Sequence, residues 1–209
     1  MNTDRYRRID LLIWAFILVI FESIILYAAR MPRFAAQPFT VSAAGAIVCI
    51  VMMRWGKWCV LHAALSGIVL CVFKGGTLSQ YLIYILGNAF CLIALPLLNK
   101  TGREKVSKGR YLYLLYGILT LLLMQAGRAL ISMVLGTPAG QASGFFTTDS
   151  LSIVFTLVAL FVAKHRDGVY EEQTAWLKRF HENQENQESQ ESQENQNKPN
   201  PNEERPVEE

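Results

Sequence analysis

Four polar residues inside apolar stretches are the positions at which this chain could carry out chemistry. Glu22 and Arg128 each lie well inside a long hydrophobic run, and Gln125 precedes Arg128 by about one helical turn. Asn88 lies near the middle of another run, beside Gly87. A charged side chain inside a bilayer costs a few kcal/mol on insertion scales, so such residues are candidates for a functional site.

The same residues admit a structural and a functional interpretation. We expect Glu22 and Arg128 to form an ion pair, which either only locks two helices together or belongs to a binding site; alternatively, the Arg128 side chain snorkels outward. In the functional interpretation, Arg128 and Gln125 present hydrogen-bond donors to an anionic or amide-bearing ligand. Asn88 either bridges helices or contacts that ligand. The candidate substrate-binding residues are therefore Arg128, Gln125, Asn88 and Glu22.

The chain lacks the motifs of common enzymes. It has no His-Glu-x-x-His, no Gly-x-Ser-x-Gly and no phosphate-binding glycine loop with its lysine, so we expect no enzymatic activity and no cofactor. His62 is expected to be a packed or interfacial residue, because the other two histidines, His165 and His181, lie beyond the last predicted span. The four cysteines all lie in apolar runs without a Cys-x-x-Cys pair, which favours buried free thiols.

Hydrophobic runs that could cross a membrane position these residues. Hydrocarbon about 30 Å thick needs roughly 20 helical residues per crossing. The pattern predicts an all-α, polytopic membrane protein with a six-helix transmembrane bundle in residues 1–163. The expected spans are 9–29, 39–53, 58–73, 78–98, 111–135 and 151–163.

The basic residues between the spans predict their orientation. Every second connection is basic, with fourteen Lys and Arg on one side of the predicted membrane and three on the other. The positive-inside rule therefore places both termini in the cytoplasm. With that orientation, Glu22 and Arg128 both fall in the outer half of the bilayer.

Shorter patterns predict turns, close packing and a polar tail. The segment 54–57 is expected to be a tight basic turn, 74–77 a turn, and 136–150 a loop rich in Gly, Ser and Thr. Small residues at 42–46 and in Ala63-x-x-x-Gly67 predict close helix packing, either within the fold or against a partner subunit. Beyond the spans, 164–181 is expected to contain an interfacial amphipathic helix, and the Glu/Gln/Asn-rich segment 182–209 to be disordered.

The region 37–98 resembles a known family. Residues 37–41 (Gln-Pro-Phe-Thr-Val) lead into a short small-residue helix, the turn 54–58 (Arg-Trp-Gly-Lys-Trp) follows, and the next helix ends in Leu-Ser-Gly-Ile-Val at 65–69. This arrangement resembles the substrate-binding S components of energy-coupling factor (ECF) transporters. Residues 9–29 contain no Ala-x-x-x-Ala, a docking motif that the family often has in its first helix.

The resemblance implies a bacterial cell-membrane subunit that binds a vitamin-like solute from outside. Its implied partners are the small-molecule solute, the lipid bilayer, a transmembrane coupling subunit and two ATPase subunits, with no nucleic acid. It implies a ligand site bounded by 30–38, 74–79, 136–150 and the outer part of the fifth span. The alternative is a non-transporting membrane scaffold or assembly factor whose acidic tail recruits a soluble partner.

Overall fold

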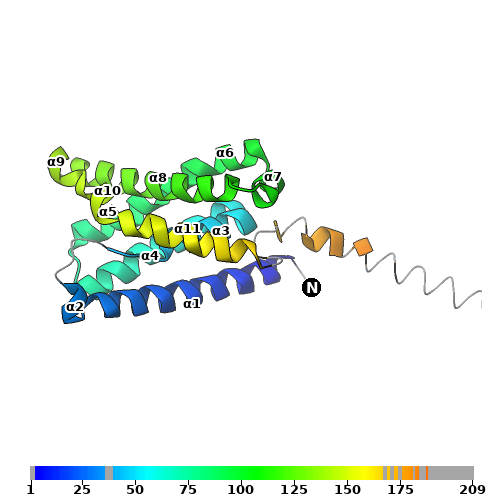
Figure 1. The fold of residues 1–209 in the computed structure, drawn as a ribbon, viewed down its shortest axis with the longest axis horizontal. Coiled ribbons are helices and arrows are strands. Elements are labelled where there is room, and N and C mark those ends of the chain that lie inside the picture. Colours follow the sequence, from blue (N-terminus) through cyan, green and yellow to red (C-terminus); the bar gives the residue numbers. More distant parts are fainter. Residues whose placement is uncertain are drawn as a thin grey trace, which may run out of the picture. The chain divides into compact units, whose positions relative to one another are not determined.

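The described residues of the chain form helices joined by short connections (Figure 1). A computed structural model describes residues 3–35, 40–166, 169, 172–173, 176–180, 182–183 and 187. It divides into two units, Met1–Glu172 and Gln173–Glu209. The elements of the first unit are α1 (Thr3–Ala29), α2 (Pro32–Ala35), α3 (Ala44–Trp55), η1 (Gly56–Trp58), α4 (Cys59–Lys74), α5 (Leu78–Asn88), η2 (Ala89–Ile93), α6 (Ala94–Thr101), α7 (Arg103–Lys108), α8 (Leu112–Val134), α9 (Ala139–Ala142), α10 (Gly144–Thr148) and α11 (Ser150–Lys164).

The predicted all-helical membrane fold is confirmed, because no described residue lies in a strand and five helical stretches are long and apolar enough to cross a membrane. One of the five, Ala44–Lys74, contains α3, η1 and α4 together. The twelve residues of α3 extend only about 18 Å at helical rise, less than the hydrocarbon thickness. Six crossings and cytoplasmic termini stay predictions.

Contacts along α1, α3 and α4 show that α3 and α4 form an antiparallel hairpin. Asp10 near the start of α1 bonds Arg54 at the end of α3, whereas Glu22 bonds the backbone N–H of Ala44 at the start of α3, so α1 and α3 are antiparallel. The α4 helix runs parallel to α1, because His62 near its start lies against the Leu11 carbonyl and Phe73 near its end accepts from Arg30 just after α1. The chain reverses at Gly56, whose φ of 61° lies in the left-handed region that favours glycine. The predicted tight turn at this position is therefore confirmed.

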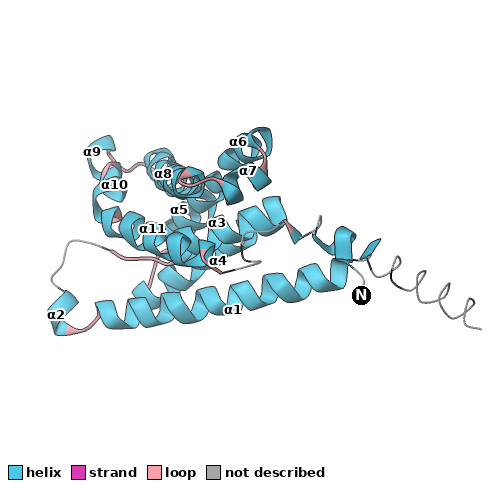
Figure 2. Ribbon diagram, turned by 45° about the vertical axis from the view of Figure 1, so that its right-hand side comes forward, coloured by secondary structure: helices cyan, strands magenta, loops and turns pink. Residues whose placement is uncertain are grey.

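The later helices continue the alternation of direction. Asn88 at the end of α5 bonds Arg128 in the second half of α8, whereas Thr101 at the end of α6 bonds Tyr116 in the first half of α8. The stretch 78–101 and α8 are therefore antiparallel. Lys164 at the end of α11 donates to the Gly109 carbonyl just before α8, while Asp149 just before α11 bonds Arg128. Figures 1 and 2 both show α1 along one side of this bundle and α8 on the opposite side.

Several predicted boundaries differ from the structure for physical reasons. Residues 40–43 were expected in a helix but are not helical, because Thr40 N–H donates to the Thr148 carbonyl instead. The fourth predicted span is interrupted by the 3₁₀ segment η2 ahead of Pro96, which has no N–H for an α-helical bond. The expected loop 136–150 contains the short helices α9 and α10. The predicted turn at 74–77 is confirmed, with Thr77 and Gln80 forming a capping box for α5.

The two small-residue segments pack inside the fold as predicted. A Cβ at Gly45 would lie 2.8 Å from Thr156 Oγ1, and one at Gly67 would lie 2.9 Å from the Tyr84 carbonyl carbon. These glycines therefore allow α3 to approach α11, and α4 to approach α5. The large apolar side chains of α1 that are exposed, such as Leu12 and Phe16, are suited to contact lipid.

Residues at the beginning of α1 and the end of α3 form a buried polar cluster, which we call the basic-end cluster (Asp10, Arg54 and Trp55). The Asp10 carboxylate accepts from Arg54 Nε at 2.9 Å, from Arg54 Nη2 at 2.8 Å and from Trp55 Nε1 at 2.5 Å. Arg54 Nη1 also donates to the Val169 carbonyl at 3.3 Å. This cluster joins α1, α3 and the segment after α11.

In the second unit, the residues from Trp176 to Phe180 are helical, and the rings of Trp176 and Phe180 stack with centroids 5.3 Å apart. This is the described part of the predicted interfacial helix. The predicted disordered segment 182–209 lies outside the described residues, except for Glu182, Asn183 and Gln187.

We predict that Gly87→Ala destabilises the protein where α5 crosses α8. The added Cβ would lie 2.6 Å from both the backbone N and the Cα of Arg128, which are held in a helix and cannot move independently. Overpacking of this kind costs about 1–3 kcal/mol. Unfolding by SDS titration in mixed micelles measures the loss. Gly144→Ala is the matched control, because its Cβ would meet nothing within 4 Å. Equal stability of the two variants would contradict the prediction.

Candidate binding cavity

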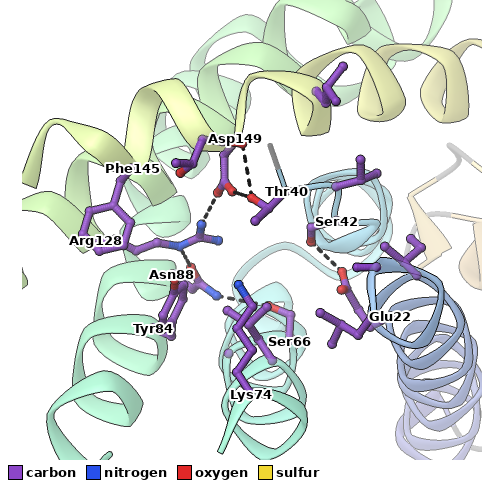
Figure 3. A pocket seen from close by; sticks show the side chains of 18 of the residues that line it. Glu22, Thr40, Ser42, Ser66, Lys74, Tyr84, Asn88, Arg128, Phe145 and Asp149 are labelled. Carbon is purple, nitrogen blue, oxygen red and sulfur yellow. Dashed lines mark hydrogen bonds and ion pairs between the residues drawn. The ribbon is translucent and has the colours of Figure 1, made fainter. Parts of the chain in front are cut away.

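A cavity of about 970 Å³ opens where α1, α4, α5, α8 and α10 meet (Figure 3). Residues 40–42, which are not helical because α3 begins only at Ala44, form part of its border. The residues that line it are Glu22, Ile25, Leu26, Ala28, Ala29, Phe34, Thr40, Val41, Ser42, Ser66, Gly67, Leu70, Lys74, Tyr84, Asn88, Arg128, Gln141, Gly144, Phe145, Thr148, Asp149 and Leu151.

Arg128 is the centre of a polar network on one wall. Its Nε donates to Asn88 Oδ1 at 2.6 Å, its Nη1 donates to an Asp149 carboxylate oxygen, and its guanidinium lies 5.2 Å from the Tyr84 ring centroid. Asp149 also accepts from the Thr40 hydroxyl. The network thus joins α5, α8, the start of α11 and the non-helical segment before α3.

Asn88 extends this network to α4. Its Nδ2 donates to the Ala63 carbonyl at 3.0 Å and to Ser66 Oγ at 3.1 Å, while its Oδ1 accepts from Arg128. Only 1% of the Asn88 surface is exposed. Asn88 therefore bridges helices, which is its structural interpretation. It also lines the cavity, which its interpretation as a ligand-contacting residue requires.

Glu22 lies on the opposite wall and caps α3. Its Oε1 accepts from Ser42 Oγ at 2.5 Å and from the Ala44 backbone N–H at 2.9 Å. The Ala43 side chain at the N-cap position cannot accept a bond, so Glu22 satisfies an N–H group that the helix leaves open. An acidic group at this end also interacts favourably with the helix dipole.

The expected ion pair between Glu22 and Arg128 is wrong. Arg128 pairs with Asp149 instead, and Glu22 bonds the start of α3. Asp149 reaches Arg128 because the short helices α9 and α10 fold the 136–150 segment back over the bundle. From the sequence, Asp149 resembled an ordinary polar residue of a connection. Its only signal was that it is the one acidic residue among 136–150.

Gln125 is placed differently from the other three candidates. It is buried, with 1% of its surface exposed, but it does not line the cavity. Neither its Oε1 nor its Nε2 has a hydrogen-bond partner among the described residues. The structure therefore brings Glu22, Asn88 and Arg128 to one cavity and leaves Gln125 in the packed interior.

Three residues that the sequence did not single out also shape the site. Lys74, the last residue of α4, extends its side chain into the space between Asn88 and Glu22 in Figure 3. Tyr84 and Phe145 meet edge to face, with ring centroids 6.0 Å apart. The lining residues Phe34, Lys74 and Asp149 belong to the three connections expected to bound a ligand site.

The remaining candidate positions lie away from the cavity. His62 is buried, and its Nε2 is 3.1 Å from the Leu11 carbonyl oxygen. All four cysteines are buried and free, as the sequence indicated. No group of three or more His, Cys, Asp or Glu side chains in the described part of the chain could hold a metal ion.

The fold and the cavity define a helical membrane protein with a polar pocket inside its bundle. The chain matches no protein-family model, no curated protein and no solved structure. The functional argument therefore rests on the residues of the cavity.

Proposed function

We propose that this chain is the membrane-embedded solute-binding subunit of an uptake transporter of the ECF type. The observation that carries the proposal is the cavity of about 970 Å³ lined by Glu22, Arg128 and Asp149 in a bundle of apolar membrane-spanning helices. Buried ionisable groups in membrane helices are costly and usually mark a ligand or ion site. The cavity volume lies within the range of roughly 300–1,000 Å³ typical of small-molecule sites.

The composition of the walls supports a small organic solute. Apolar side chains from α1, α4 and α10 face fixed polar groups on Asn88, Arg128 and Ser42, a combination that binds a solute and sets its orientation. Asn88 and Arg128 are held by several hydrogen bonds each, so binding would not need to order them. Such preorganisation reduces the cost of association.

The position of the cavity suits capture from one side of the membrane. The cavity lies at the end of the bundle where α1 ends at Ala29 and α4 ends at Lys74, and the basic-end cluster lies at the opposite end. Under the predicted orientation, the cavity end faces outside. ATP hydrolysis and the coupling to transport would belong to partner subunits, because the sequence contains no nucleotide-binding motif.

The proposal predicts that a small organic molecule co-purifies with the full-length protein. Protein extracted in mild detergent is washed, denatured and analysed by mass spectrometry for released compounds. Leu70→Trp, which adds volume to the cavity wall, should reduce the released amount several-fold, whereas Leu115→Trp, on the exposed face of α8, should not.

If the protein is a scaffold or assembly factor instead, no small molecule should co-purify with it. If no compound is released, and deletion of residues 182–209 abolishes function in cells, the transport proposal fails and the assembly-factor interpretation replaces it. If the deletion leaves both function and the released compound unchanged, the solute-binding proposal stands.

A further inference from the structure

The charged side chains that line the cavity fall into one paired set and two single groups. They are Glu22, Lys74, Arg128 and Asp149, two acidic and two basic. Arg128 and Asp149 form an ion pair with each other. Among the described side chains, neither Glu22 nor Lys74 takes part in an ion pair.

Glu22 is an acidic group that lacks a cation. Only 1% of its surface is exposed, and its two bonds come from a hydroxyl and a backbone N–H, which are neutral donors. Arg128, the nearest basic side chain of the network, is already paired with Asp149. A buried carboxylate is costly unless it is paired with a charge of opposite sign. A cationic group in the cavity beside Glu22 would supply this pairing.

Lys74 is an exposed basic group on the cavity wall and has no ion-pair partner among the described residues. Its side chain lines the cavity from the end of α4, and Gly75, with a left-handed φ of 65°, directs the chain away after it. The Lys74 ammonium carries three donors and has no hydrogen-bond partner among the described residues. An anionic group of a ligand would accept from it.

The aromatic side chains indicate what lies between the two charged ends. Tyr84 and Phe145 line the cavity beside the Arg128 network, with Ile25, Leu26 and Leu70 on other parts of the wall. Flat aromatic and aliphatic surfaces of this kind favour an apolar or ring-containing ligand body.

We propose that the cavity binds a dipolar solute, with a cationic amine or ring nitrogen at Glu22, an anionic group at Lys74 and an apolar or cyclic body between them. This inference rests on the proposed solute-binding function and narrows it to one class of ligand. The Arg128–Asp149 pair then acts as a neutral, polar wall and does not select for ligand charge.

The test uses 4-(aminomethyl)benzoate as a dipolar probe, with benzoate and benzylamine as its two singly charged parts. The thermal unfolding midpoint of the full-length protein in detergent is measured with each probe. The variants are Lys74→Gln and Glu22→Gln, which remove a charge but keep a polar side chain. Gln at position 22 still accepts from Ser42 and Ala44. Lys57→Gln is the matched control, because the Lys57 side chain is exposed just before α4 and does not line the cavity.

The dipolar probe should raise the midpoint of the wild-type protein and of Lys57→Gln more than either part does. In Lys74→Gln, which lacks the group for the anionic end, the dipolar probe should raise the midpoint no more than benzylamine does. In Glu22→Gln, which lacks the group for the cationic end, it should raise the midpoint no more than benzoate does. Equal stabilisation by all three probes, or a similar loss in Lys57→Gln, would overturn the inference.

The co-purifying compound provides a second, independent readout. A bound compound without a cationic group, or without an anionic group, would overturn the dipolar assignment while supporting the solute-binding function. If no compound co-purifies and no probe stabilises the protein, both the assignment and the proposed function fail.

Discussion

Arg128→Met is expected to destabilise the bundle by about 3–5 kcal/mol and to abolish retention of the co-purifying solute, because removing one partner of a buried ion pair leaves the other charge unpaired. Arg128 and Asp149 expose only 8% and 12% of their side chains. The variant also removes the donor to Asn88 Oδ1 and the cation beside the Tyr84 ring. SDS titration measures the stability, and mass spectrometry measures the solute.

A double-mutant cycle separates the ion pair from the other contacts of Arg128. Asp149→Asn keeps an acceptor for the Thr40 hydroxyl but removes the charge, and the double variant Arg128→Met/Asp149→Asn leaves no unpaired charge. We expect the double variant to be more stable than Arg128→Met alone. Solute retention should stay low in both, because the polar wall is lost.

Arg103→Met is the control for loss of an arginine. Arg103 pairs with Glu172 at 3.2 Å, but their side chains are 18% and 42% exposed, and such surface pairs contribute about 0–1 kcal/mol. If Arg128→Met were no more destabilising than Arg103→Met, the network around Arg128 would not have the structural role assigned to it. If Arg128→Met retained the solute normally, the cavity would not be the binding site.

Local sequence patterns predicted the features of this fold that depend on near neighbours in the chain. Apolar runs located the long helices, Gly56 marked the hairpin turn, and Ala63-x-x-x-Gly67 marked a close helix contact. The rarity of polar residues in those runs was enough to select Glu22, Asn88 and Arg128. All three line one cavity although they come from α1, α5 and α8.

The pairing of these residues could not be predicted, because it depends on contacts between distant segments. Asp149 becomes the partner of Arg128 only when α10 folds back and bonds Thr40, which is 109 positions away from Asp149 in the chain. Glu22 turns instead to the start of α3, whose position depends on where that helix begins. The local sequence of Lys74 indicated only a turn, and the family resemblance placed the connection 74–79 at the border of a site without selecting Lys74 itself.

The basic-end cluster gives the second large expected effect. Asp10→Ala should destabilise the protein by about 3–5 kcal/mol, because it removes the carboxylate that pairs with the buried Arg54 guanidinium and accepts from Trp55 Nε1. The Arg54 and Asp10 side chains are only 9% and 12% exposed. SDS titration of the full-length protein measures the loss.

A nearby surface pair on the same helix provides the control for Asp10→Ala. Asp4 bonds Arg7 at 2.7 Å, but the side chains are 29% exposed for Arg7 and 62% exposed for Asp4, so Asp4→Ala should change stability by less than about 1 kcal/mol. Equal effects of the two substitutions would show that the buried cluster contributes no more than a surface pair.

Asp10→Ala also tests whether the cavity works independently of the opposite end of the bundle. Asp10, Arg54 and Trp55 do not line the cavity, so protein that stays folded at low temperature should retain its solute in the wild-type amount. Arg128→Met should lose the solute even at a temperature where it is fully folded. An equal loss of solute from folded Asp10→Ala protein would mean that the basic-end cluster positions α3, together with Ser42 and Glu22. The site would then depend on the whole length of the α3–α4 hairpin.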